Sequence, residues 1–127
     1  MDVRLGVVGA HLRGQPLNPQ LLDLGAVFVQ QTWTAPQYRL FVLPDTSPSK
    51  PGMIRSEDGG SIEIEVWQLG ASALGALVAS VPPPLVIGSV KLASGEWIKG
   101  FLCEEIGLKD APEITSRGGW RAYLASI

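Results

Sequence analysis

The 127-residue sequence has one cysteine, one histidine and no long apolar run, and each scarcity excludes a class of protein. A lone cysteine, Cys103, cannot form an internal disulfide, and its apolar neighbours indicate a buried thiol. One histidine and one cysteine cannot supply the ligands of a zinc site, so we expect no metal. No apolar stretch reaches the roughly 20 residues of a membrane-spanning helix, and the first residues lack a secretory signal. These absences predict a cytoplasmic protein without membrane contact.

Charged residues are also few, and their distribution argues against nucleic-acid binding. They make up 17% of the chain, and the net charge is −2. The 10 basic residues are scattered and do not alternate with aromatic residues that could stack on bases. The hydrophobic fraction of 46% is that of an ordinary globular chain. Residues 1–127 are therefore predicted to form a single domain.

Glycine and proline, with 15 and 10 residues, divide the chain into short segments. Apolar runs and alternation predict strands over residues 4–10, 26–34, 38–43, 53–56, 61–69, 85–92 and 96–103. Short helices are predicted over residues 20–24, 71–81 and 120–125. The Asp58-Gly59 step favours a hairpin between 53–56 and 61–69, and a second hairpin is expected between 85–92 and 96–103. We therefore predict an α+β domain with a mixed, mostly antiparallel sheet that closes into a small β-barrel, and two or three short helices outside it.

The single histidine directly follows the first predicted strand, in the stretch VVGAHLRGQPLN of residues 7–18. A side chain just past the end of a buried strand lies where loops converge and pockets form. Its imidazole is suited to proton transfer near neutral pH, and the backbone N–H groups of residues 10–14 could face an anion. The alternative is that His11 only ties down its loop through hydrogen bonds, and composition alone favours that interpretation.

The segment IEIEVWQL of residues 62–69 places two glutamates, Glu63 and Glu65, on one face of a strand. Alternation with isoleucine usually leaves carboxylates in water. In a closed sheet, one of them could instead lie in a cavity with a raised pKa. Tyr38, Lys50 and Lys99 lie at strand starts or near loops, where each could be either a surface residue or a polar wall of a site.

Several segments, taken in order, resemble the C-terminal domain of allophanate hydrolase. The resemblance extends from about residue 4 to residue 125, and its segments are VVGAHLRGQPLN, LGAVFVQQTWTAPQYRLFVLP, KPGMIR, IEIEVWQL, VKLASGEWIKGFLCE and ITSRGGWRAYLA. It implies a fold like that of γ-glutamyl cyclotransferase. Cyclotransferase activity itself is not expected, because helix 71–81 lacks an acidic residue where those enzymes place a catalytic glutamate.

The resemblance also implies a function. In full-length allophanate hydrolases, an amidase-signature domain releases ammonia from allophanate, and the product that the resemblance leads us to expect is N-carboxyurea. This domain is then expected to decarboxylate that product or a related small carbamate, with the histidine of GAHL, here His11, in proton transfer. The expected partners are a small anionic urea-like ligand, an amidase-signature domain or protein, and a second copy in a homodimer. The alternative is a non-catalytic module that binds a small ligand or assists assembly with an amidase.

The expected site needs an anion cradle and a proton donor, but no metal or organic cofactor. Besides His11, the residues expected to contact the ligand are Gly9, Ala10, Leu12, Arg13, Tyr38, Lys50, Glu65 and Lys99. The backbone around residues 9–13 is expected to hold the carboxylate. Glu65 is expected to bind a urea-like NH2 group, and the remaining side chains are expected to form polar walls.

Overall fold

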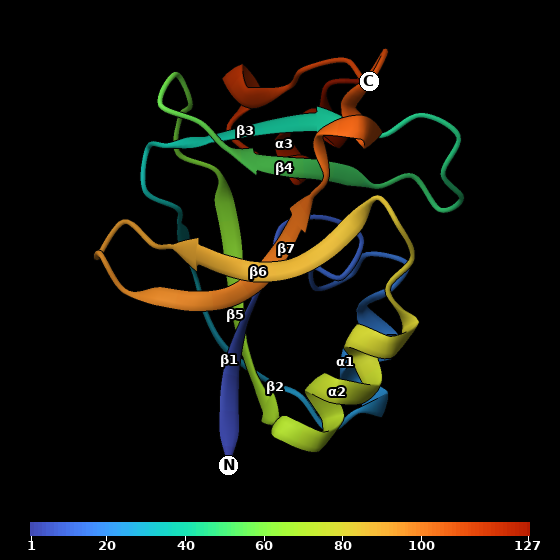
Figure 1. Ribbon diagram of the computed structural model, residues 1–127, viewed down its shortest axis with the longest axis vertical. Helices are drawn as coiled ribbons and strands as arrows, with labels where there is room; N and C mark the ends of the chain where they lie inside the picture. Colours follow the sequence, from blue (N-terminus) through green and yellow to red (C-terminus); the bar gives the residue numbers. More distant parts are fainter.

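The computed structural model describes residues 1–127 as a five-stranded sheet and a separate two-stranded sheet (Figure 1). The large sheet has the order β2-β5-β1-β7-β6, and the small one consists of β3 and β4. The strands are β1 Asp2–Val7, β2 Val27–Trp33, β3 Tyr38–Val42, β4 Pro51–Arg55, β5 Glu63–Gly70, β6 Leu85–Lys91 and β7 Trp97–Cys103. The helices are α1 Asn18–Asp23, α2 Ala71–Ser80 and α3 Trp120–Ala125, with 3₁₀ turns at Glu105–Leu108 and Thr115–Arg117.

The large sheet is mixed and open, so the predicted closed barrel is wrong. Strand β1 pairs antiparallel with β5 and parallel with β7, while β2–β5 and β6–β7 are antiparallel. Its edge strands, β2 and β6, do not pair with each other along their length. A single bridge links their ends, between Thr34 just after β2 and Leu92 just after β6. Strands β3 and β4 pair with each other and not with either edge of the large sheet.

The predicted hairpin between residues 53–56 and 61–69 is also wrong. Strand β4 pairs with β3, whereas β5 lies in the large sheet between β1 and β2. The Asp58-Gly59 step serves another purpose, because a Cβ on Gly59 would lie 2.4 Å from the backbone nitrogen of Tyr38. Gly60 then exchanges two backbone hydrogen bonds with Tyr38, of 2.8 and 3.1 Å. The glycines thus allow the connection to lie against β3, and no tight turn pairs β4 with β5.

The other local predictions agree better with the structure. Strands β6 and β7 form the predicted antiparallel hairpin, and α3 has the bounds expected from the sequence. Helix α2 ends at Ser80, one residue before the predicted end, and α1 begins earlier than expected, at Asn18. The expectation of an α+β fold with a mostly antiparallel mixed sheet and up to three helices is therefore confirmed.

The hydrophobic core extends over both faces of the large sheet, because the alternating side chains of β5 are buried on either side of it. Residues Leu5, Val7, Ile64 and Val66 of the central strands are completely buried. Helices α1 and α2 lie on one side of the large sheet, away from β3, β4 and the C-terminus (Figure 1). Cys103 is buried, as its apolar neighbours predicted. None of the helices is long and apolar enough to cross a membrane.

Candidate functional site

His11 lies in the loop between β1 and α1, and its ring is held from several sides. The ring stacks on Phe101 of β7, with a centroid distance of 4.8 Å and an angle of 20° between the planes. Its Nε2 atom lies 2.8 Å from Oε1 of Gln20, on the first turn of α1. The backbone carbonyl of His11 accepts a 2.9 Å hydrogen bond from the side chain of Asn18. With only 8% of its surface exposed, His11 has a defined orientation.

A cavity of about 230 Å³ opens beside the His11 ring. Its walls come from the loop after β1, the start of α1, the loop before β4, the end of α2, and strands β6 and β7. The lining residues are Val8, Gly9, Ala10, His11, Leu17, Gln20, Ser47, Pro48, Lys50, Pro51, Ser80, Val81, Pro82, Leu85 and Phe101. A pocket therefore lies where the chain leaves its first strand, as the sequence predicted.

A close contact between Gly9 and the Pro51 ring brings Lys50 to the same cavity as His11. A Cβ on Gly9 would lie 2.3 Å from Cδ and 2.4 Å from Cγ of Pro51, closer than carbon atoms can approach. Only glycine lets the two loops meet in this way. The half-buried Lys50 precedes Pro51, and its backbone N–H donates to the Thr46 hydroxyl at 3.1 Å. The glycine of the GAHL stretch thus places a cation next to the imidazole.

The surroundings of His11 favour the neutral imidazole. Burial is the largest influence and lowers the pKa of His11 below its ordinary value of 6.5. The hydrogen bond with Gln20 opposes this effect, and the positive charge of Lys50 lowers the pKa of His11 further. The ring is therefore uncharged at neutral pH, in the state in which it can accept a proton.

The predicted ligand-contacting residues divide into two groups. Gly9, Ala10, His11 and Lys50 line the cavity. The other members do not line it, and these are Leu12, Arg13, Tyr38, Glu65 and Lys99.

Each residue of this second group has another contact in the fold. The Leu12 N–H donates to the carbonyl of Gly9, and the hydroxyl of buried Tyr38 accepts a hydrogen bond from the Lys91 N–H. The exposed Lys99 donates to Ser89.

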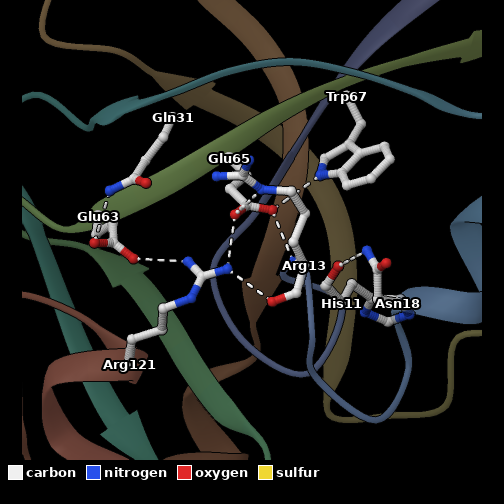
Figure 2. A network of polar contacts seen from close by, with 8 residues as sticks. All are labelled: His11, Arg13, Asn18, Gln31, Glu63, Glu65, Trp67 and Arg121. Atoms are coloured by element: carbon white, nitrogen blue, oxygen red, sulfur yellow. Dashed lines mark hydrogen bonds and ion pairs between the residues drawn. The ribbon is translucent and has the colours of Figure 1, made fainter.

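The remaining two, Arg13 and Glu65, belong to a separate polar network (Figure 2). The Glu65 side chain is fully buried, and its carboxylate accepts hydrogen bonds from the backbone and side chain of Arg13, at 2.9 and 3.0 Å. Arg121 of α3 and the Trp67 indole add bonds of 2.8 and 3.2 Å. Figure 2 shows the Arg121 guanidinium between Glu65 and Glu63, with a 3.0 Å contact to Glu63. One loop N–H, that of Arg13, does therefore bind an anion, but this anion is the protein's own carboxylate.

This network keeps Glu65 ionised. Burial alone would raise the pKa of Glu65, but the hydrogen bonds from Arg13, Arg121 and Trp67 outweigh it and hold the pKa below its ordinary value. The expectation of a glutamate with a raised pKa in a cavity is therefore wrong. The alternation of residues 62–66 placed both glutamates on one face correctly, but that face is covered by α3 and the His11 loop.

Sequence reasoning missed Gln20 and Phe101 at the cavity and Arg121 at the network. Gln20 follows Asn18-Pro19 in a predicted helix directly after the histidine loop, so chain proximity could have indicated it. Nothing local singles out Phe101 or Arg121, because their partners lie 90 and 56 residues away in the sequence. No group of three or more histidine, cysteine, aspartate or glutamate residues is arranged to hold a metal ion.

The fold places the chain in a class of proteins that share the fold of γ-glutamyl cyclotransferase. A solved γ-glutamyl cyclotransferase superposes with a TM-score of 0.58 at 16% identity, over 82% of this chain and 68% of that one. Identity at this level establishes a common fold only.

Within this class, the chain belongs to the allophanate hydrolase C-terminal domain family, whose model matches residues 3–125. Urea amidolyase of Saccharomyces cerevisiae is 48% identical over 99% of this chain, which spans only 7% of the yeast protein. Allophanate hydrolase of Kluyveromyces lactis superposes with a TM-score of 0.95 at 42% identity, over 99% of this chain and 21% of that one. The uropathogenic E. coli-specific protein c4763 has a TM-score of 0.91 at 38% identity, over 100% of this chain and 98% of that one. Proteins similar to this chain thus include both much longer chains and one of about this size.

Proposed function

We propose that this domain binds a small N-carboxylated carbamate and decarboxylates it with His11 as the proton-transfer residue. N-carboxyurea, the substrate expected from the resemblance, is allophanate itself, and hydrolytic release of its ammonia leaves N-carboxycarbamate instead. The observation that carries the proposal is that His11 and Lys50 line one small cavity. Membership of the allophanate hydrolase C-terminal domain family supports a place in urea or allophanate breakdown, next to an amidase that supplies the carboxylated carbamate.

The cavity suits a ligand of this size and charge. Its volume of about 230 Å³ is below the roughly 300–1,000 Å³ of pockets for drug-sized molecules. Lys50 supplies the one cationic side chain in the lining, apart from the titratable His11, and can pair with the carboxylate. Proline, valine, leucine and phenylalanine side chains form much of the remaining wall, and they keep the dielectric low around that ion pair.

The reaction requires one proton and no cofactor. His11 takes up a proton from solvent and gives it to the nitrogen that carries the carboxylate. The C–N bond then breaks, its electron pair stays on nitrogen, and CO2 and carbamate leave. The imidazole is neutral again and ready for a second proton.

The charge of the ligand assists this proton uptake. Without a ligand, burial and Lys50 lower the pKa of His11. A carboxylate beside Lys50 compensates that positive charge and raises the pKa of His11 toward neutrality. The imidazole is therefore protonated preferentially when the substrate is bound, which is the state in which a proton donor is needed.

A non-catalytic module is the second candidate, and it has a specific observation in its favour. Ring stacking on Phe101, the Gln20 contact and the Asn18 bond are also what a purely structural histidine would form. In that case the cavity would bind a ligand, or the domain would support an amidase, without proton transfer.

The experiment that separates the two candidates measures CO2 release. A relative's amidase, freed of its own C-terminal domain, converts allophanate in the presence of this chain. We expect His11→Ala to lower the rate enhancement over the uncatalysed reaction roughly 10²–10⁴-fold, as for a positioned acid–base group, and Lys50→Met to raise KM about tenfold. Lys109→Met, at an exposed position, is the matched control. Equal rates for wild type and His11→Ala would refute the catalytic proposal and favour the module.

A further inference from the structure

Gln20 is the one residue that hydrogen-bonds the His11 ring, and it determines which ring nitrogen is left for chemistry. We infer that Gln20 is a positioning residue. By accepting the Nε2–H hydrogen bond, it holds His11 in the tautomer whose Nδ1 atom is open to the cavity. The kinetic part of this inference rests on the proposed function, but the tautomer does not.

The helix that carries Gln20 is tied firmly to the histidine loop. The Leu17 N–H donates to the Ala10 carbonyl at 2.8 Å, and the Asn18 amide donates to the His11 carbonyl at 2.9 Å. Pro19 gives the first turn of α1 a fixed φ and needs no hydrogen-bond partner there. Gln20 therefore meets the ring from a rigid position, and Phe101 fixes the ring plane from one face.

The contacting atoms identify the tautomer. The Gln20 atom 2.8 Å from Nε2 is the carbonyl oxygen Oε1, which can only accept, so Nε2 carries the hydrogen. A neutral imidazole has one N–H, which leaves Nδ1 with a free lone pair. No residue of the protein hydrogen-bonds Nδ1. If Nδ1 were fully buried, it would be a buried polar atom without a partner, but the one such side-chain atom is Oε1 of Gln37. Nδ1 therefore keeps access to solvent, and the solvent-accessible space that the ring borders is the cavity.

An uncharged orienting partner has a further consequence. A carboxylate in the place of Gln20 would stabilise the imidazolium and make it a weaker acid. Glutamine fixes the tautomer without adding a negative charge. The charged side chain that faces the ring from the opposing loop is Lys50, whereas the contacts from α1 and β7 are the neutral Asn18, Gln20 and Phe101. The ring thus returns readily to its neutral form.

The test uses NMR on the intact chain, where His11 is the single histidine and its ring signals are unambiguous. In wild type we expect ¹⁵N shifts of a protonated Nε2 and an unprotonated Nδ1. Gln20→Leu should produce a mixture of both tautomers. Gln20→Glu, which keeps the shape, should raise the pKa of His11 by about one to three pH units. Gln30→Leu, at an exposed position of β2, is the matched control and should change neither quantity.

Activity measurements then separate this inference from the proposed function. If both hold, Gln20→Leu lowers kcat for CO2 release about tenfold, the loss expected for one hydrogen bond, with KM nearly unchanged. The pH profile of Gln20→Glu moves to higher pH by the same amount as its NMR titration. If the tautomer shifts as expected and no variant affects CO2 release, Gln20 positions His11 and the decarboxylase proposal fails.

Two results would overturn the inference itself. One is a Gln20→Leu protein with an unchanged tautomer. The other is a Gln20→Glu protein whose His11 pKa does not rise. If Gln20→Leu does not fold, the titration of the isosteric Gln20→Glu decides alone.

Discussion

The two polar regions on either side of the histidine loop differ in how fully their hydrogen-bonding groups are used. Around Glu65, both carboxylate oxygens are bonded, two arginines are paired, and the carboxylate has no exposure. Around His11, one ring nitrogen is bonded to Gln20 and the other faces a cavity that also contains the half-buried Lys50. One region is saturated, and the other keeps groups open for a ligand.

The difference indicates that one part of the histidine loop has a structural role and that the neighbouring part is available for chemistry. The Glu65 network joins the backbone of Arg13 to β5 and α3, so it fixes the loop two residues after His11. The saturated region therefore supplies rigidity, and the neighbouring open region can use that rigidity to hold His11 in place. Both carry ionisable groups on the same loop, so the sequence pattern by itself does not distinguish them.

The largest stability effect is expected at the saturated region. Glu65→Gln removes a buried charge from two arginines, and it should lower the free energy of unfolding by about 2–4 kcal/mol, because breaking a buried pair leaves its partners uncompensated. Arg13 and Arg121 keep 47% and 31% side-chain exposure, which limits the loss. Urea denaturation of wild type and Glu65→Gln measures this change in the free energy of unfolding.

An exposed glutamate provides the control for that measurement. Glu96 pairs with Arg4 at 3.7 Å, with both side chains more than 40% exposed. Glu96→Gln should change the free energy of unfolding by no more than about 0.5 kcal/mol. A Glu65→Gln protein as stable as Glu96→Gln would contradict the supporting role of the network.

A smaller effect is expected where the two loops meet at the cavity. Gly9→Ala places a methyl group against Pro51, so the loops must separate, which should cost about 1–3 kcal/mol of stability and move Lys50 away from His11. The same substitution at Gly75, in α2 with nothing within 4 Å, should stabilise the protein by about 0.5–1 kcal/mol. Thermal unfolding of both variants tests the opposite signs. A stabilised Gly9→Ala protein would show that the loop contact does not hold the site.

The smallest effect is a pH dependence that also distinguishes the regions. The pKa of Glu65 is lowered in the folded protein, so its stabilising contribution is present above the ordinary pKa of 4.5 and is lost as pH falls through the folded value. Wild type should lose at most about 1.4 kcal/mol per pH unit from this group below pH 4.5, and Glu65→Gln should not. Denaturation curves between neutral and acidic pH measure the slope. Parallel curves for both proteins would exclude a lowered pKa of Glu65 in the folded state.

Local sequence features predicted the elements well. The alanine-rich run of α2, the Gly118-Gly119 pair before α3 and the turn between β6 and β7 each contain their own start and stop signals. Pairing partners were less predictable. Alternation in residues 62–66 defines two faces of a strand, but it does not say which strands lie beside it, and β5 became central rather than the arm of a hairpin.

The candidate site was predicted in part for the same reason. The position of His11 at the end of a buried strand indicated a cavity, because loops converge at the ends of strands. Lys50 reached that cavity through the contact of Gly9 with Pro51, more than 40 residues apart in the sequence. Lys99, also near a strand and a loop, faces solvent instead.

The sequence by itself determined the types of the local elements, the family and the single imidazole in the loop after β1, because these depend on short-range patterns and on residue identity. The tertiary structure alone decided that the sheet stays open, that Glu65 is buried and paired, and that Gln20 and Lys50 flank His11. Those outcomes depend on which distant segments share one core, and a one-dimensional pattern of polar and apolar residues specifies faces but not partners.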